Sequence, residues 1–222
     1  MAILILGSIP VTAHAADLGS ESALRSAVAR GGSYKIGKNI KLSERLVIPS
    51  GNTVTLDLNS CILDRGLTEY TNDGNVIYVE KGATLIINDT SIKGTGAITG
   101  GFSNYGGGIL NYGDVTLYGG TITGNSAYAS ASYTGGGIFN NSGATLTLSG
   151  GTISGNRANM GGGVYCIHGS KLIIESSIQE KTIDGTQKKV ECNVTITGNY
   201  AGKGGAIYSA DADISLSGGA EL

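Results

Sequence analysis

A short phrase of sequence recurs at a nearly fixed interval through the second half of this 222-residue chain. Blocks of Gly-Gly-Gly or Gly-Gly-Ala followed by an apolar residue begin at Gly106, Gly135, Gly161 and Gly204. A second block, Ile-x-Gly-Asn, ends at Asn125, Asn156 and Asn199, and its first two copies are 31 residues apart. Self-similarity at a period of this size is typical of proteins that stack one structural repeat on the next. The chain is therefore predicted to be a repeat protein.

Each copy holds three short runs with the composition of β-strands. In the copy that begins at Gly135 they are the Ile-Phe run at Ile138, Leu146–Leu148 and Thr152–Ser154. The last two alternate apolar residues with Thr or Ser, as a strand with one buried face does. Gly pairs and Asn residues suit the corners, where the backbone bends or takes a positive φ. We predict a β-solenoid with three strands per coil and parallel pairing between coils. A β-propeller is the alternative at this period, but its blades need four strands and hairpin turns.

The first 33 residues precede the β-rich part. Residues 1–15 carry the apolar stretch and the Ala13-His-Ala15 cleavage site of a secretory signal peptide, although the basic residues that usually open one are missing. Export is the prediction, and a cytosolic protein with an apolar start is the alternative. Residues 16–33 are predicted to form one helix, capped by Ser20 and ended by Gly31, that covers the N-terminal end of the solenoid.

The solenoid is predicted to occupy residues 34–222. Coils in 34–100 are irregular and those in 101–222 follow the Gly-rich repeat, with further coils expected beyond residue 222. A charged insertion at about 168–193 is interpreted as a solvated loop, with a ligand-binding excursion as the alternative. Strands are expected in the irregular part at Tyr34–Ile36, Ile40–Leu42, Leu46–Ile48, Val54–Leu58, Cys61–Leu63, Val76–Val79 and Thr84–Ile87.

Cysteines and histidines offer little chemistry. Cys166 and Cys192 flank the insertion, so a disulfide across its base is one possibility and two small buried thiols are the other. Cys61 has no evident partner in the sequence. His168 is the only histidine after residue 15, and the cysteines are too widely spaced for a metal site, so no metal is predicted. No cofactor is predicted either, because the Gly-rich blocks are not followed by the helix and the Lys-Ser/Thr of a phosphate loop.

The charge of the chain limits the classes of partner that it can bind. The formal net charge is −2 at pH 7, with 15 basic and 17 acidic residues. Nucleic acids and anionic membranes both require a basic patch or stripe. The sequence therefore argues against a nucleic-acid partner and against a membrane surface as the partner.

The repeat phrases resemble a known family. Gly135-Gly-Gly-Ile-Phe-Asn140 and Leu146-Thr-Leu-Ser-Gly-Gly-Thr-Ile-Ser-Gly-Asn156 resemble the right-handed parallel β-helix (pectin-lyase-like) regions of large cell-surface proteins in Gram-positive gut bacteria. Gly-Gly-Ala-Ile at Gly204–Ile207, alternating with Ile-x-x-Asn, is also similar to the repeats of chlamydial polymorphic outer-membrane proteins, which are adhesins. The resemblance covers residues 106–219 and implies the architecture; the fold hosts lyases, hydrolases and adhesins alike.

A catalytic site is difficult to assemble from the acidic residues. A polysaccharide lyase of this type needs acidic residues for Ca²⁺ and a basic residue as proton acceptor, and an inverting hydrolase needs two carboxylates. From Thr90 to Ile174 the sequence has one carboxylate, Asp114, and one arginine, Arg157. In the irregular coils Asp57, Asp64 and Arg65 are the nearest approach to a catalytic group, and a local salt-bridged turn is the alternative for them.

Two further residue sets recur. Asn125, Asn156 and Asn199 share one repeat position and are predicted to stack as an internal hydrogen-bonded ladder, with contact to a sugar as the alternative. The candidate ligand surface consists of the tyrosines Tyr105, Tyr112, Tyr118, Tyr128 and Tyr133. We expect a secreted or cell-surface, adhesin-like module that binds glycans or proteins without catalysis. A polysaccharide lyase or glycoside hydrolase, with its site in the early coils or in a C-terminal region beyond 222, and a spacer without ligand are the alternatives.

Overall fold

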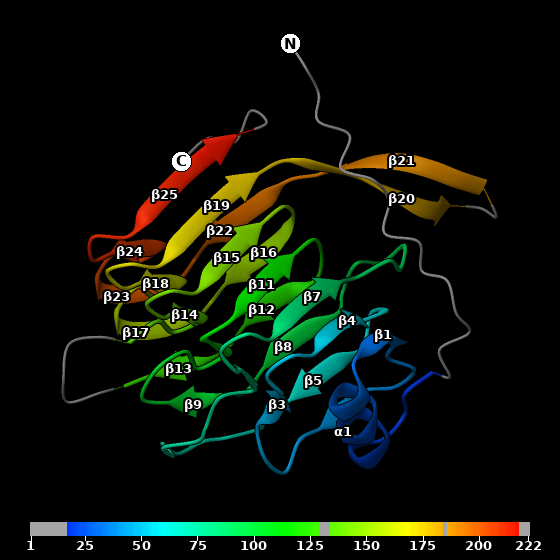
Figure 1. Ribbon diagram of the computed structural model, residues 1–222, viewed down its shortest axis with the longest axis horizontal. Coiled ribbons are helices and arrows are strands. Elements are labelled where there is room, and N and C mark those ends of the chain that lie inside the picture. The colour runs from blue at the N-terminus through cyan, green and yellow to red at the C-terminus, as the bar shows by residue number, and fades with distance from the viewer. Residues whose placement is uncertain (1–16, 129–133, 184–185, 218–222) are drawn as a thin grey trace.

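The chain winds into a stack of coils (Figure 1). The computed structural model describes residues 17–128, 134–183 and 186–217, so the expected signal peptide and Tyr133 lie outside the described residues. Strands of successive coils pair in parallel, and the same sheet receives one strand from each coil. The fold is a parallel β-helix with one short helix at its N-terminal end, as the sequence predicts.

The coils build four parallel sheets. We number them 1 to 4 in the order in which the chain passes through them in each regular coil. Sheet 1 has the order β1 (Gly32–Lys35), β4 (Thr53–Asp57), β7 (Thr84–Asn88), β11 (Asp114–Leu117), β15 (Thr145–Leu148), β19 (Lys171–Glu175), β25 (Asp213–Ser217). Sheet 2 has the order β2 (Ile40–Lys41), β5 (Ile62–Asp64), β8 (Ala97–Thr99), β12 (Thr121–Thr123), β16 (Gly151–Ser154), β22 (Val194–Thr197). Sheet 3 has the order β9 (Phe102–Ser103), β13 (Ser126–Ala127), β17 (Arg157–Met160), β23 (Tyr200–Lys203). Sheet 4 has the order β3 (Leu46–Ile48), β6 (Ile77–Val79), β10 (Ile109–Asn111), β14 (Ile138–Asn140), β18 (Val164–Cys166), β24 (Ile207–Ser209).

Sheet 3 is the difference from the three strands per coil that the sequence predicts. Its strands are two to four residues long, and only one or two positions of each face the interior. Those inward positions hold small residues such as Ala127 and Ala158, which are buried. Because no run of Ile, Leu or Val marks these strands, hydrophobic alternation does not reveal them.

Inward-facing residues of the other sheets form one apolar column. In sheet 1 the register aligns Leu85, Val115, Leu146 and Leu172, and in sheet 2 it aligns Ile98, Ile122 and Ile153. All of them are buried. The irregular coils at residues 34–100 join the same sheets in the same register, so one continuous core runs from β1 to β19.

The Gly-Gly-Gly blocks are explained by close backbone packing at the corner that leads from sheet 3 into sheet 4. The first glycine of each block has positive φ, for example 67° at Gly135. A Cβ added to the second one, Gly136, would lie 2.5 Å from the carbonyl oxygen of Gly162 in the next coil. A side chain at either place is excluded by conformation or by contact, so the repeat needs glycine there.

Helix α1 (Glu21–Arg30) covers the N-terminal end of the stack. Ser20 accepts a hydrogen bond from the backbone N–H of Ala23, and the helix buries Leu24, Ala27 and Val28 against the first coils. This agrees with the helical cap that the sequence predicts. Helix α1, the one helix among the described residues, is too short to cross a membrane.

An ionic latch fastens this helix to the first coil. One carboxylate oxygen of Glu21 accepts hydrogen bonds from the Arg25 guanidinium (2.6 and 2.9 Å) and from the N–H and hydroxyl of Ser43 (3.0 and 2.9 Å). Arg25 also donates to the carbonyls of Glu44 and Arg45. Burial alone would raise the pKa of Glu21, but the hydrogen bonds from Arg25 and Ser43 lower it to about 2.

The charged insertion is a β-hairpin where the sequence predicts a loop. After Lys171–Glu175, which stays in sheet 1, β20 (Ser177–Ile183) and β21 (Thr186–Cys192) pair antiparallel and extend away from the stack (Figure 1). The chain then returns to sheet 2 at Val194. The charged side chains of Glu180, Lys188, Lys189 and Glu191 are exposed to solvent, and seven antiparallel pairs of residues give the hairpin regular structure.

The possible disulfide between Cys166 and Cys192 is wrong, because the two residues lie at different corners of the coil. Cys166 is fully buried in β18, at the corner between sheets 4 and 1. Cys192 ends the hairpin at the corner between sheets 1 and 2, near Gly150. Strand β19 separates them. Burial raises the pKa of the Cys166 thiol to about 11, so this side chain acts as a small apolar residue.

Candidate ligand-binding groove

The three repeated asparagines lie at the corner between sheets 2 and 3. The Oδ1 atom of Asn156 accepts hydrogen bonds from the backbone N–H (3.1 Å) and from the Nδ2 (3.0 Å) of Asn125. Asn199 does the same for Asn156, at 3.0 and 2.9 Å. Each Nδ2 also donates to a strand carbonyl of a neighbouring coil, such as that of Ile122. These amides satisfy buried backbone groups, which leaves their polar atoms directed into the fold and away from a ligand.

A second ladder, which the sequence analysis did not identify, lies at the corner between sheets 4 and 1. Asn111 donates to Oδ1 of Asn140 at 2.8 Å, and Asn140 donates to the carbonyl of Lys171 at 2.8 Å. Cys166 takes the next position of this column and interrupts it. The signal for it was present in the sequence, since both Gly-Gly-Gly-Ile blocks end in Asn two residues after Ile.

Two acidic residues of the early coils accept hydrogen bonds from the backbone. Asp57, at the end of β4, is buried and accepts hydrogen bonds from the N–H groups of Asn59 (3.1 Å) and Thr90 (2.9 Å) and from the Thr90 hydroxyl. The fully buried Asp89 accepts from the N–H groups of Ser60 (3.0 Å) and Gly96 (2.7 Å). Both carboxylates hold tight turns together, which is a structural role.

Asp57, Asp64 and Arg65 do not form one site. Asp57 ends a strand of sheet 1, whereas Asp64 ends a strand of sheet 2 and accepts a hydrogen bond from the N–H of Gly66 at 2.7 Å. The buried Arg65 donates to main-chain carbonyls of Leu42 (2.9 Å), Ser43 (2.6 Å) and Asn75 (3.2 Å). Burial, followed by repulsion from Arg25, lowers the pKa of its guanidinium. Arg65 therefore links neighbouring coils through hydrogen bonds to their main-chain carbonyls. Among the described residues, no group of three His, Cys, Asp or Glu side chains is placed to hold a metal ion.

Four of the five candidate tyrosines are described, and they separate into two environments. Tyr105 and Tyr112 are half-buried against an aromatic column on the outer face of sheet 4. Tyr118 is half-buried on sheet 1, where burial and then the Glu175 carboxylate raise its pKa. Tyr128 is 62% exposed. Only Tyr128 of the described four has a ring that is largely available to a ligand.

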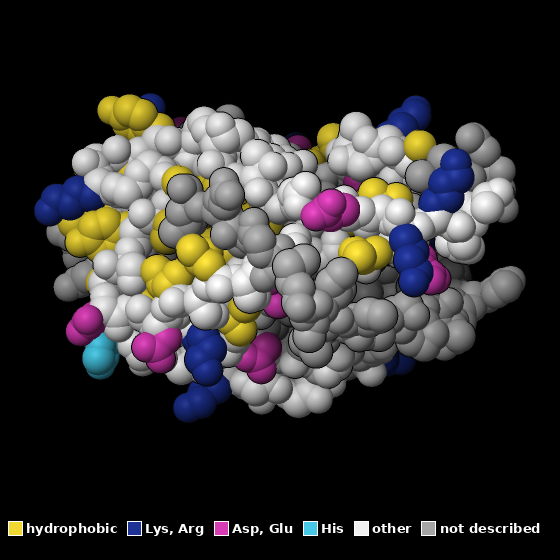
Figure 2. Space-filling view, turned by 90° about the horizontal axis from the view of Figure 1, so that it is seen from above, with side chains coloured by type: hydrophobic (Ala, Val, Ile, Leu, Met, Phe, Trp, Pro, Cys, Tyr) yellow, Lys and Arg dark blue, Asp and Glu magenta, His cyan; other side chains and the backbone are white. Residues whose placement is uncertain are grey.

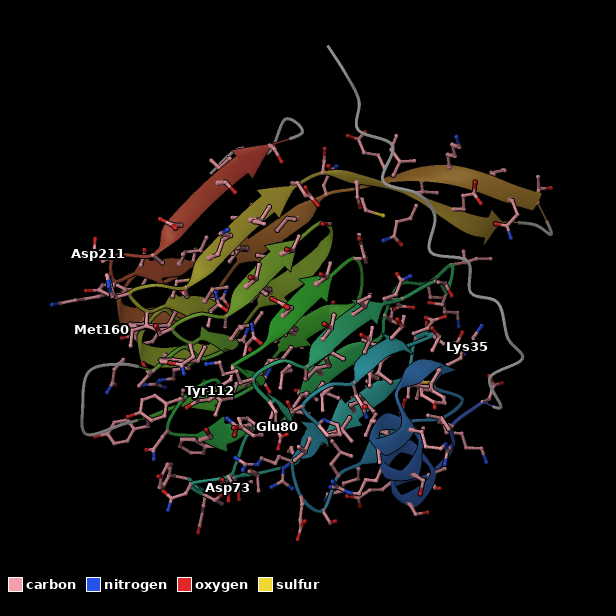
Figure 3. The ribbon with its side chains drawn as sticks, viewed as in Figure 1. Lys35, Asp73, Glu80, Tyr112, Met160 and Asp211 are labelled. Atoms are coloured by element: carbon pink, nitrogen blue, oxygen red, sulfur yellow. The ribbon has the colours of Figure 1, made fainter. Side chains whose placement is uncertain are left out.

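The aromatic column is a second core outside the coil. Its rings stack one per coil: Phe139 lies 5.3 Å from Tyr165, and Tyr165 lies 5.3 Å from Tyr208, with nearly parallel planes in both pairs. Tyr112 and Met160, labelled in Figure 3, pack against it from the flanks. Stacked rings at this spacing stabilise the coils, and Phe139 and Tyr165 are too buried to meet a ligand.

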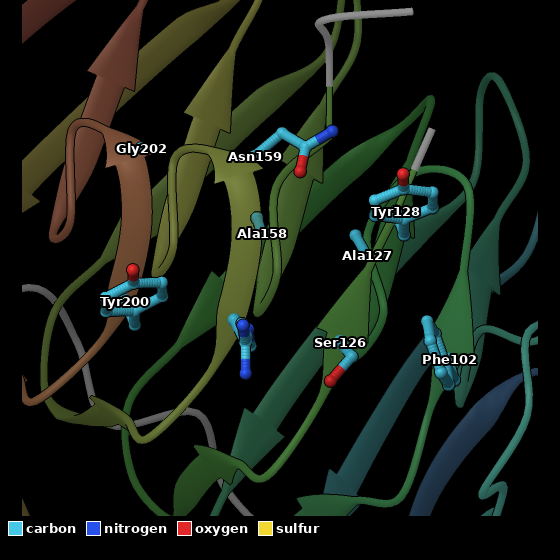
Figure 4. Close-up of a pocket in the computed structure, with 9 residues that line it drawn as sticks. Phe102, Ser126, Ala127, Tyr128, Ala158, Asn159, Tyr200 and Gly202 are labelled. Carbon is cyan, nitrogen blue, oxygen red and sulfur yellow. The ribbon is translucent and has the colours of Figure 1, made fainter. Parts of the chain in front are cut away.

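A groove follows the outer face of sheet 3 across four coils (Figure 4). The register places Phe102, Ser126, Arg157 and Tyr200 in one row, one residue per coil. Two residues further along these strands, Tyr128, Asn159 and Gly202 form a second row. The cavity measures about 690 Å³. This size lies within the range of sites that bury a small ligand.

Arg157 dominates the electrostatics of this groove. Its guanidinium carbon lies 5.2 Å from the ring centroid of Tyr200, so the two flat groups lie close together. None of the described residues that line the groove is acidic, and no salt bridge among the described residues includes Arg157. Tyr200 is 65% exposed. The groove therefore offers hydrogen-bond donors beside exposed aromatic rings.

Of the residues that line this groove, the sequence analysis proposed only Tyr128 as a ligand contact. The missing signal is the residue that follows each ladder asparagine: Ser126, Arg157 and Tyr200 come directly after Asn125, Asn156 and Asn199. Once the ladder asparagines are aligned, these three residues necessarily face outward side by side in adjacent coils. Comparison of the chain with protein-family models, with curated proteins and with solved structures gives no match.

Proposed function

We propose that this chain is a non-catalytic, exported β-helix module that binds a glycan in the groove over sheet 3. The observation that carries the proposal is the pair of exposed rings, Tyr128 and Tyr200, beside the polar groups of Ser126 and Arg157. The strands that carry the two rings are two coils apart, which is roughly 10 Å along the stack. Flat aromatic faces with a few hydrogen-bonding groups between them fit an extended chain of sugar rings.

The distribution of acids supports binding over hydrolysis. Glycoside hydrolysis needs two carboxylates on opposite sides of the scissile bond. The groove has no carboxylate among its described lining residues, and Asp57 and Asp89 accept hydrogen bonds from backbone N–H groups of turns elsewhere. A lyase or hydrolase would therefore need a site built from other residues.

The architecture and the repeat resemblance support a role at the cell surface. A parallel β-helix is a stiff rod, because successive coils are hydrogen-bonded to one another along parallel sheets, three in the early coils and four from β9 onward. Rods of this kind present a long face at a distance from their attachment. The resemblance to cell-surface repeat proteins and the signal-peptide pattern of residues 1–15 agree with such a placement.

A panel of plant, mucin and bacterial polysaccharides tests the proposal. Retention of the chain on each immobilised polysaccharide is measured together with the release of reducing ends and of unsaturated products. The expected result is saturable retention on at least one polysaccharide without product, lost in a Tyr128→Ala/Tyr200→Ala double variant. Ile92→Ala, which removes an exposed apolar side chain remote in sequence from the groove, is the control and is expected to bind normally. Retention that survives the double variant, or turnover, would contradict the proposal, and no retention on any polysaccharide would favour a spacer.

A further inference from the structure

Arg157 is the only charged residue among the nine described residues that line the groove over sheet 3. Its side chain is exposed, and no salt bridge within the described part of the chain involves it. The guanidinium carbon lies 5.2 Å from the ring centroid of Tyr200, a contact that satisfies none of the guanidinium N–H donors. These donors are therefore available to an acceptor that enters the groove.

Acidic residues are absent from the sheet that forms the groove. The four strands of sheet 3 contain two basic residues, Arg157 and Lys203, and no acidic one. From β8 onward, the acidic residues of the described strands belong to sheet 1 and to the hairpin of β20 and β21: Asp114, Glu175, Glu180, Glu191 and Asp213. On the face of the molecule seen from above, by contrast, acidic and basic side chains are interspersed (Figure 2). An anion in the groove meets a cation, with no carboxylate on the same sheet to repel it.

The other lining residues suit uncharged sugar units. The rings of Tyr128 and Tyr200 are exposed, and Asn159 lies on β17, between the strands that lead to these two rings (Figure 4). Only one cation lines a groove that crosses four coils, so a glycan with an acid on every sugar would leave most of its charges without a partner. The groove fits a largely neutral glycan that carries one acidic group.

We infer that the ligand of this groove is a glycan of mainly neutral sugars with one acidic group, a carboxylate or a sulfate, which Arg157 binds. This inference rests on the proposed glycan binding. A guanidinium donates two parallel hydrogen bonds to the oxygens of such a group, and these bonds are strengthened by charge. Tyr128 and Tyr200 stack on the neutral sugars. Arg157 therefore selects among glycans, whereas the rings bind sugars in general.

Matched glycans that differ only in the acidic group test the inference. Immobilised N-acetyllactosamine oligomers are compared without an acid, with a terminal sialic acid and with a terminal sulfate, and xylan is compared with glucuronoxylan. Polygalacturonate, which has an acid on every sugar, completes the set. In at least one comparison the acidic form is expected to bind about tenfold or more tightly than the neutral form, as one charge-assisted contact gives. This preference is expected to shrink at high salt.

Two arginine substitutions assign the preference to the groove. An Arg157→Gln chain is expected to bind the acidic form no more tightly than the neutral form, while its binding of the neutral form is retained. Arg30→Gln, which removes an exposed arginine from the last turn of α1, is the matched control and is expected to keep the preference. Circular dichroism confirms that both variants are folded.

The outcomes separate this inference from the function on which it rests. Equal binding of the acidic and neutral forms, with no effect of Arg157→Gln, would overturn the inference and leave glycan binding standing. An acidic preference that survives Arg157→Gln would also overturn it, because another residue would then bind the acid. Tighter binding of polygalacturonate than of every other glycan in the set would contradict a single acidic group. No binding to any glycan of the set would overturn both the inference and the proposed function.

Discussion

Removing one rung of the asparagine ladder at Asn156 is expected to destabilise the whole stack. Its side chain makes hydrogen bonds to the N–H and the Nδ2 of Asn125, to the carbonyl of Ile122 and to Oδ1 of Asn199. In an Asn156→Ala chain the buried N–H of Asn125 and the carbonyl of Ile122 lose these partners. Each orphaned buried group costs about 1–3 kcal/mol, so the expected loss in free energy of unfolding for the two groups is about 2–6 kcal/mol.

Urea unfolding followed by far-ultraviolet circular dichroism measures this loss. The control is Asn141→Ala, which removes the same amide from a partly exposed side chain one residue after the second ladder. A substitution at such a site usually changes the free energy of unfolding by no more than about 0.5 kcal/mol. Equal effects of the two substitutions would refute the argument that the ladder satisfies buried backbone groups.

Three further predictions concern the cap, the glycine corner and the buried thiol. The pKa of Glu21, about 2, lies below its ordinary value of 4.5, so the stability it contributes is present above about pH 4.5 and is lost as the pH falls toward 2. Thermal melts from pH 5 to 2 are expected to show a smaller pH dependence in Glu21→Gln, and an unchanged dependence would contradict the latch. Gly136→Ala is expected to lower the free energy of unfolding by about 1–3 kcal/mol, because the new Cβ meets backbone oxygens of neighbouring residues, while Gly19→Ala, with only a flexible Lys38 nearby, is expected to be nearly neutral. Cys166 is expected to react with a thiol reagent only after denaturation. In denatured protein that has not been reduced, all three cysteines are expected to react. Reaction of one cysteine alone would show that the other two form a disulfide.

Most of the fold could be predicted from the sequence repeat. Period, alternation and the Gly-rich blocks predict the parallel coils, because each strand has one buried face and the corner that leads from sheet 3 into sheet 4 takes a backbone that glycine accepts. The helical cap followed from Ser20 and the stripe of Leu24, Ala27 and Val28. Even the irregular strands were located to within a few residues, for example Thr53–Asp57 where Val54–Leu58 was expected.

Other features could not be predicted from the sequence, because they depend on which residues of neighbouring coils lie side by side. Sheet 3 has too few inward positions to leave an apolar pattern, so its outer face, with Arg157 and Tyr200, was not assembled in advance. The sequence of β20 and β21 predicts a charged loop, because the pairing of these two strands buries few side chains. Tyr105 and Tyr112 appeared suited to ligands, but stacking between coils made them part of a second core.

A fluorescence titration tests the central claim, that the groove over sheet 3 binds a glycan, most directly. The chain has no tryptophan, so a Tyr200→Trp variant places a single reporter in the groove and a Tyr118→Trp variant places one on sheet 1. Titration with a polysaccharide that retains the unmodified chain is expected to change the emission of the Tyr200→Trp variant saturably and to leave that of the Tyr118→Trp variant unchanged. Emission that stays constant in the groove while the polysaccharide binds would contradict the account.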